Sequence, residues 1–130
     1  MLIYEELSNK ILKAYNNVLN ILGKGLAEKV YENAICIELE LLGIPFERQK
    51  PLTVQYKGHV VGNYIADAFI DGKIIIELKA VSAITREHIA QTLNYMNLTN
   101  SKVGYILNFS QNEGCGFQRL LGQAAKSATE

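Results

Sequence analysis

The chain has 130 residues, 48% of them hydrophobic, which is enough for one globular core and excludes a disordered chain. Thirteen basic residues balance thirteen acidic ones. This composition argues against a tight, non-specific nucleic-acid binder, so any such contact must depend on a local patch or a metal. We expect residues 1–130 to form a single domain.

The two cysteines, Cys36 and Cys115, have no second Cys or His at zinc-ligand spacing, which predicts a reducing compartment. Cys36 lies in a helical pattern and is expected in the core. The N-terminus has no signal-peptide pattern, and no stretch is long enough to span a membrane. We therefore expect a soluble cytoplasmic protein without membrane contact.

Two amphipathic helices are predicted at the start of the chain, over residues 3–21 and 26–42, the second stopping at Gly43. The second helix carries Glu28 and Glu32 four residues apart on one face. Like charges at this spacing are mildly destabilising unless a cation lies nearby. The alternative is an ordinary solvated acidic face.

A strand is predicted over residues 46–56, and Pro51 within it favours an edge position or a bulge. The stretch that follows the second helix is the most basic in the chain. Either phosphate contact or plain solvent exposure accounts for its cations, which are Arg48, Lys50, Lys57 and His59.

Residues 64–80 form the most informative stretch, because two runs of β-branched and aromatic residues flank an Asp-Gly turn signal. This pattern predicts an antiparallel hairpin. Three charges, Asp67, Glu77 and Lys79, interrupt the apolar runs. Ionised side chains in buried strands are costly unless they are paired or bind a metal.

The length of the hairpin loop decides whether the three charges meet. Glu77 and Lys79 share a face because they are two residues apart. A two-residue loop would point Asp67 away from Glu77, whereas a three-residue loop over residues 70–72 would pair Phe69 with Lys73 and bring Asp67 to the same face. We predict an odd-length loop or a bulge.

Two carboxylates and a lysine on one face suit a hard divalent cation such as Mg²⁺ or Mn²⁺. The alternative is a structural ion pair between Lys79 and either Glu77 or Asp67. Charges of that kind often protect edge strands from aggregation.

After the hairpin, a helix is predicted over residues 86–97, with Thr85 as its N-cap. Gln91 and Tyr95 share one face of this helix. A central strand over residues 102–109 and a short helix over 116–126 follow. The order α-α-β-β-β-α-β-α predicts an α/β fold with a mixed central sheet flanked by helices.

These elements resemble the PD-(D/E)XK nuclease superfamily in their order: a helix glutamate, Asp67 in a hairpin, Glu77-Leu78-Lys79, then Gln91 and Tyr95 on a helix before a strand. The likeness spans roughly residues 21–109. Within it, Gly25-Leu-Ala-Glu28-Lys-Val-Tyr31 is similar to the signature of the GxxExxY branch. Each motif is weak singly, and their order and spacing carry the resemblance.

The resemblance implies a restriction-endonuclease-like core, α-β-β-β-α-β, with an extra N-terminal helix. It also implies that Asp67, Glu77 and the Leu78 carbonyl hold the metal and that Lys79 positions the attacking water and stabilises charge on the phosphate. Glu28 would complete the carboxylate set, with Glu32 as the less favoured substitute.

Gln91 and Tyr95 match the Gln-x-x-x-Tyr motif of the RecB-like exonuclease branch, where these residues help to hold the substrate. One departure is that Ala66 precedes Asp67, where the superfamily often has a proline. That proline is variable in the superfamily.

Three functional hypotheses follow. The first is an Mg²⁺- or Mn²⁺-dependent nuclease acting on DNA. The second is a catalytically silent module that binds a partner protein or nucleic acid, or forms a homo-oligomer. The third is a nuclease subunit that gains substrate affinity from a partner.

Overall fold

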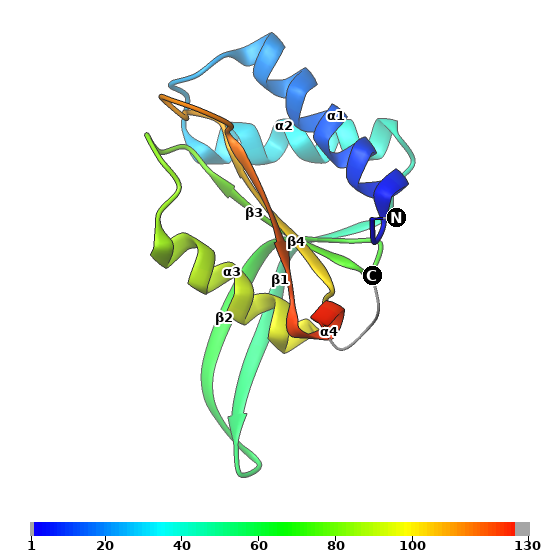
Figure 1. Cartoon of the computed structure of the whole chain (residues 1–130), viewed down its shortest axis with the longest axis vertical. Coiled ribbons are helices and arrows are strands. Elements are labelled where there is room, and N and C mark those ends of the chain that lie inside the picture. The colour runs from blue at the N-terminus through cyan, green and yellow to red at the C-terminus, as the bar shows by residue number, and fades with distance from the viewer. Residues whose placement is uncertain (1, 127–130) are drawn as a thin grey trace.

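A computed structural model of the chain describes residues 2–126. A five-stranded sheet with strand order β1-β2-β3-β4-β5 lies between helices (Figure 1). This arrangement confirms the predicted mixed sheet flanked by helices, with an additional helix at the N-terminus. The elements are α1 (Glu5–Leu22), α2 (Glu28–Leu41), β1 (Phe46–Tyr56), β2 (His59–Ile70), β3 (Ile74–Lys79), α3 (Arg86–Thr99), β4 (Val103–Asn108), β5 (Phe117–Leu121) and α4 (Gln123–Lys126).

The sheet is mixed because one connection crosses over while the others are hairpins. β1, β2 and β3 follow one another antiparallel, and β5 is antiparallel to β4. β3 and β4 are parallel, and α3 forms the crossover that parallel neighbours require. β4 is buried along its whole length and lies inside the sheet, as its apolar sequence predicts.

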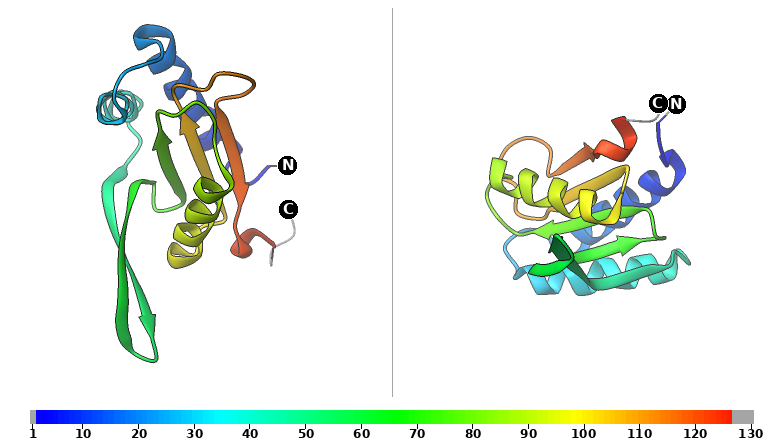
Figure 2. Two further views of the ribbon diagram at one scale, coloured as in Figure 1. Left: turned by 90° about the vertical axis from the view of Figure 1, so that its left-hand side faces the viewer. Right: turned by 90° about the horizontal axis from the view of Figure 1, so that it is seen from below.

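The core has two layers, one on each face of the sheet. Side chains of a strand alternate between faces, so Ile74 and Ile76 pack under α1 and α2, whereas Ile75 packs under α3. Figure 2 shows α3 on the opposite side of the sheet from α1 and α2. The odd-numbered face of β3, which carries Glu77 and Lys79, is therefore the α3 face.

β1 and β2 extend well beyond the rest of the sheet as a two-stranded ribbon (Figure 1). β2 has 12 residues, of which Ala68–Ile70 pair with β3. We call residues 50–66 the arm. Its tip is the two-residue turn of Lys57 and Gly58, both with positive φ, which suits the right-handed twist of paired strands. β1 is an edge strand, so Pro51 lies where its sequence signal predicted.

The prediction of a helix over residues 116–126 was wrong for most of that range. Phe117–Leu121 is strand β5, and only Gln123–Lys126 is helical. Pairing with β4 satisfies backbone groups that a short amphipathic helix would leave exposed along the β4 edge. The first two helices begin two residues later than predicted, at Glu5 and Glu28.

Two compositional predictions bear on the environment of the chain. Cys36 is buried among core residues, as predicted, and Cys115 is exposed. In the part of the chain that the structure describes, no helix combines the length and apolar character needed to cross a bilayer.

The packing of α3 on β4 gives a stability prediction. A Cβ atom on Gly104 would lie 2.5 Å from Met96 Sδ and 3.3 Å from the Ile75 carbonyl oxygen. Gly104→Ala should therefore lower the free energy of unfolding by about 1–3 kcal/mol, measured by urea denaturation.

The matched control is Gly62→Ala in β2, where the atom nearest to the added Cβ would be 3.6 Å away. This variant should change the free energy of unfolding by less than about 0.5 kcal/mol. Equal losses in the two variants would contradict this account.

Candidate active site

The loop between β2 and β3 has three residues, Asp71 to Lys73, because Ile70 pairs with Ile74. Asp71 and Gly72 both have positive φ, and the Lys73 N–H donates to the Ile70 carbonyl oxygen at 2.9 Å. The prediction of an odd-length loop is confirmed. Its position is one residue later than predicted, so Phe69 pairs with Ile75 and not with Lys73. Either odd loop brings Asp67 to the face of Glu77.

Asp67 and Glu77 meet at the fork where β2 leaves β3. The regular ladder ends at the pair Ala68 and Ile76. Beyond it, the Asp67 N–H donates to Glu77 Oε2 at 2.7 Å, and the Leu78 N–H donates to Asp67 Oδ2 at 2.8 Å. Each carboxyl group thus takes the place of a backbone acceptor on the opposite strand, which fixes its orientation.

Burial disfavours the ionised forms of these two carboxyl groups and so raises their pKa values. Glu77 is only 3% exposed, and desolvation, with the neighbouring Asp67 charge, raises its pKa to about 8. Desolvation also raises the pKa of Asp67, although the bond from the Leu78 N–H opposes this. The charge of Lys79 lowers the pKa of both groups, so its ammonium lies near them.

Lys79 belongs to none of the ion pairs within residues 2–126. The alternative of a structural ion pair between Lys79 and Asp67 or Glu77 is therefore not seen. The ammonium is close enough to act on both carboxyl groups and remains available for another partner.

The two helix glutamates have different environments. Glu28 is the first residue of α2 and is exposed, yet desolvation and the Asp67 charge raise its pKa, while Lys79 lowers it. Glu32, one turn later, is buried. It accepts hydrogen bonds from Arg48 Nε at 2.5 Å, Gln49 Nε2 at 2.7 Å and Lys29 Nζ at 3.1 Å.

These bonds decide the charge of Glu32. Burial alone would raise its pKa, but the bonds and charges of Arg48 and Lys29 outweigh burial and lower it. Glu32 is thus an ionised carboxylate whose charge is already balanced. Glu28 makes no ion pair within residues 2–126, and the charges of Asp67 and Lys79 act on its carboxyl group.

A tyrosine positions the start of α2. Tyr31 is fully buried, and its hydroxyl donates to the Gly23 carbonyl oxygen at 2.6 Å while it accepts from the Leu26 N–H at 3.1 Å. Its ring stacks on Phe109 with centroids 4.5 Å apart. Gly25, within the same loop, has a φ of +95°, which favours glycine. The spacing Gly25, Glu28, Tyr31 therefore fixes the loop that precedes α2 and places Glu28 at the start of that helix, within electrostatic reach of Asp67 and Lys79.

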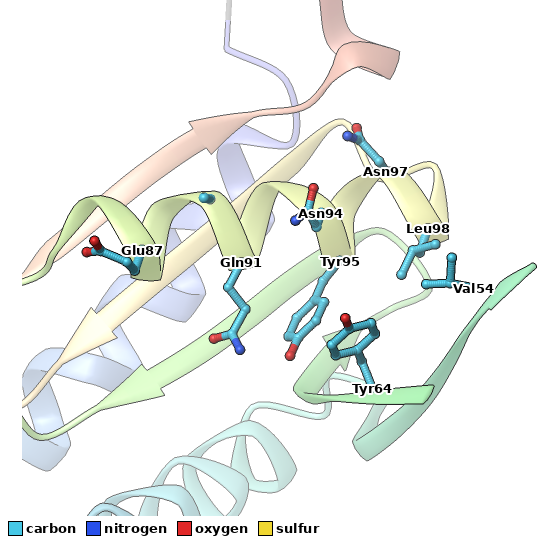
Figure 3. Close-up of a pocket in the computed structure, with 9 residues that line it drawn as sticks. Val54, Tyr64, Glu87, Gln91, Asn94, Tyr95, Asn97 and Leu98 are labelled. Carbon is cyan, nitrogen blue, oxygen red and sulfur yellow. The ribbon is translucent and has the colours of Figure 1, made fainter. Parts of the chain in front are cut away.

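α3 borders the site from the other side. Thr85 caps the helix as predicted, and His88 completes the cap, since its Nδ1 accepts from the Thr85 N–H at 3.0 Å. Gln91 and Tyr95 line a cavity and point toward β2 (Figure 3). Burial, followed by the charges of Glu77 and Asp67, raises the pKa of Tyr95, which places its hydroxyl near the fork.

One residue near the fork had no signal in the sequence. Gln49 has a φ of +52°, a left-handed conformation that is unusual for a residue other than glycine. Its amide binds Glu32 and also lowers the pKa of Asp67. Neither its residue type nor its place in a predicted strand indicates this role.

Comparison with known proteins agrees with this geometry. Residues 5–120 match the family described as the PD-(D/E)XK nuclease superfamily. The chain belongs to this superfamily. Its restriction-endonuclease-like α/β core is thereby confirmed, and nucleases of the superfamily generally use divalent metal ions and act on nucleic acids.

The comparison with solved structures supports the fold and no finer property. No curated protein matches the sequence. The solved structure of SSO0001 is similar, with a TM-score of 0.56 and 16% sequence identity, and the match covers 95% of this chain and 64% of that one. The chain therefore spans less than two thirds of that protein.

The donors at the fork fit a hard divalent cation. Asp67 and Glu77 each use one oxygen to accept from a backbone N–H, and carboxyl oxygens of this kind suit Mg²⁺ or Mn²⁺. Within the described residues, no three His, Cys, Asp or Glu side chains already form a metal cage. The third ligand would have to come from elsewhere, for which the Leu78 carbonyl and Glu28 are the nearest candidates by sequence and charge.

The raised pKa of Glu77 predicts how stability depends on pH in the metal-free protein. A carboxyl group with a folded-state pKa above its unfolded value binds more protons in the folded state, so stability falls as pH rises between the two values. With a folded-state pKa of about 8, the free energy of unfolding should fall between about pH 5 and 8.

Urea titrations in a chelator at several pH values would measure this slope. Glu77→Gln should flatten it, whereas Glu113→Gln, at an exposed loop position, should leave it unchanged. An identical slope in wild type and Glu77→Gln would contradict the buried, protonated carboxyl group.

Proposed function

We propose that the chain is a metal-dependent nuclease that hydrolyses phosphodiester bonds, with DNA as its substrate and Mg²⁺ or Mn²⁺ as its cofactor. The observation that carries this proposal is the reciprocal bonding of Asp67 and Glu77 at the fork. Lys79 lies nearby and belongs to none of the ion pairs of the described residues. Two costly buried carboxyl groups held in fixed orientation have a clear use as cation ligands.

The roles proposed for the residues follow from their positions. Asp67, Glu77 and the Leu78 carbonyl would hold the ion, which supplies Lewis acidity that activates water and neutralises phosphate charge. Lys79 would orient the attacking water and stabilise the charge that develops on the phosphate. Glu28 has a raised pKa and, unlike Glu32, belongs to none of the ion pairs of the described residues, so it is preferred as the additional carboxylate.

Gln91 and Tyr95 are proposed to hold the substrate beside these groups. Both side chains project from α3 into the cavity that Tyr64 lines from β2 (Figure 3), and Tyr95 lies within electrostatic reach of Asp67 and Glu77. A hydroxyl and an amide at this position offer donors for phosphate or sugar oxygens.

We also propose membership of the GxxExxY branch. The support is structural: Gly25 has a positive φ, Tyr31 ties the loop to α2, and Glu28 is presented between them. Each residue of the signature thus has a separate physical task in placing one carboxyl group.

Catalysis is the first test of the proposal. Lys79→Ala should reduce the cleavage rate about 10²–10³-fold, because it removes a fixed cation from the place where charge develops. Glu77→Ala should abolish cleavage. Single-stranded, duplex and branched DNA would be incubated with purified protein and Mn²⁺, and products resolved on denaturing gels.

The matched control is Lys73→Ala, since Lys73 is an exposed lysine in the loop before the same strand and pairs with Asp71. It should cleave like wild type. If wild type and Glu77→Ala behave identically on every substrate, the nuclease proposal fails.

A second candidate is a catalytically silent module of the same fold that binds a partner protein or nucleic acid, or a second copy of the chain. The observation that favours it is that the described carboxyl groups do not form a complete metal cage. A third candidate is a nuclease subunit that acquires substrate affinity from a partner. It would bind the metal, as the nuclease does, and depend on a partner, as the silent module does.

Metal binding separates these candidates. Titration calorimetry with Mn²⁺ at about pH 8 should show uptake by wild type and none by an Asp67→Asn, Glu77→Gln double variant, because carboxylates supply the ligands. Uptake with cleavage supports the enzyme, and uptake without cleavage supports the subunit. No uptake at millimolar Mn²⁺ would support the silent module.

A further inference from the structure

A groove separates the arm from α3 beside the candidate active site. It has a volume of about 600 Å³, and Val54 and Tyr64 line it from the arm, while Gln91, Tyr95 and Leu98 line it from α3 (Figure 3). This size is typical of sites that hold small organic ligands. Tyr95 lines the groove, and the charges of Glu77 and Asp67 contribute to its raised pKa. The groove therefore adjoins the fork.

The lining of the groove suits a flat ring with polar edges. Tyr64 is 48% exposed, and its ring lies 5.8 Å from that of Tyr95 at an angle of 49°. Val54 and Leu98 provide apolar walls, and the Gln91 amide offers both a donor and an acceptor. The charged residue in the lining is Glu87, which disfavours a phosphate there. Aromatic stacking with a neutral hydrogen-bonding edge is how proteins bind unpaired bases.

The charge of the arm favours a nucleic acid over another protein. The arm has no acidic residue and carries Lys50 and Lys57. Lys50 pairs with Glu47, just before the arm, at 3.0 Å. At the tip, Lys57 makes no ion pair among the described residues. A ribbon that carries cations and no carboxylate of its own attracts a phosphate backbone.

We propose that the groove receives one unpaired base of the substrate, stacked on Tyr64, while an adjoining phosphate lies at Asp67 and Glu77. This inference rests on the proposed function and adds the form of the substrate, a single strand or a frayed end. A base inside a duplex must first leave its stack to enter the groove, so intact duplex is the poorer ligand.

Binding without cleavage tests the proposal. Fluorescence anisotropy would follow a short fluorescein-labelled single-stranded oligodeoxynucleotide in a chelator at low salt. Tyr64→Ala should weaken binding about tenfold, the loss expected for one base–aromatic stack, and Tyr64→Phe should bind within about twofold of wild type. The control, Tyr56→Ala, removes another exposed tyrosine of the arm that is not in the groove lining, and should also bind like wild type.

A second measurement uses wild-type protein, so it does not depend on the folding of a variant. An oligonucleotide that carries 2-aminopurine should lose fluorescence on binding as the base stacks on the tyrosine. Unchanged fluorescence on saturation would overturn the proposal. Equal losses of affinity in Tyr64→Ala and Tyr56→Ala, or tighter binding of intact duplex than of single strands, would also overturn it.

The outcomes separate this inference from the nuclease proposal. If wild type cleaves DNA while Tyr64→Ala binds single strands normally, the groove has no such role and the nuclease proposal stands. If Tyr64-dependent binding is found without cleavage, the groove is supported and the nuclease proposal fails. If wild type neither binds nucleic acid in the chelator nor cleaves it with Mn²⁺, both fail.

Discussion

The reciprocal hydrogen bonds between Asp67 and Glu77 are the interaction on which the candidate site depends. Where two paired strands diverge, their backbone N–H groups lose their partners. Leaving such groups buried and unsatisfied costs free energy. Here the Asp67 and Leu78 N–H groups are satisfied by carboxylate oxygens from the facing strand. The same bonds let β2 leave the sheet and hold both carboxyl groups in place.

The surroundings of the fork distribute charge unevenly among four carboxyl groups. Glu32 is balanced by Arg48 and Lys29, so it serves to hold the base of the arm against α2. Glu28, Asp67 and Glu77 all have raised pKa values. Such an arrangement lowers stability, and it persists in proteins where it serves a function. A bound cation would relieve it by favouring the ionised forms.

The shape of the molecule links the fork to the groove between the arm and α3. The arm leaves the sheet at Asp67, with Gln49 in a left-handed conformation opposite the fork, and then runs alongside α3. One side of the resulting groove is formed by the arm and the other by Gln91 and Tyr95. The carboxyl groups and the groove therefore arise from a single structural event, the divergence of β2 from β3.

The sequence by itself determined the element types up to β4, the charged positions within apolar strands and the shared face of Glu77 and Lys79, because these depend on neighbours two to four residues apart. It also predicted an odd hairpin loop, although not its position. The pairing of Glu32 with basic and amide side chains, the place of Tyr64 in the groove, and the strand at Phe117–Leu121 were decided by the tertiary structure. Those features depend on which distant segments pack together and on which polar groups burial forces to pair, and local sequence patterns do not encode such partnerships.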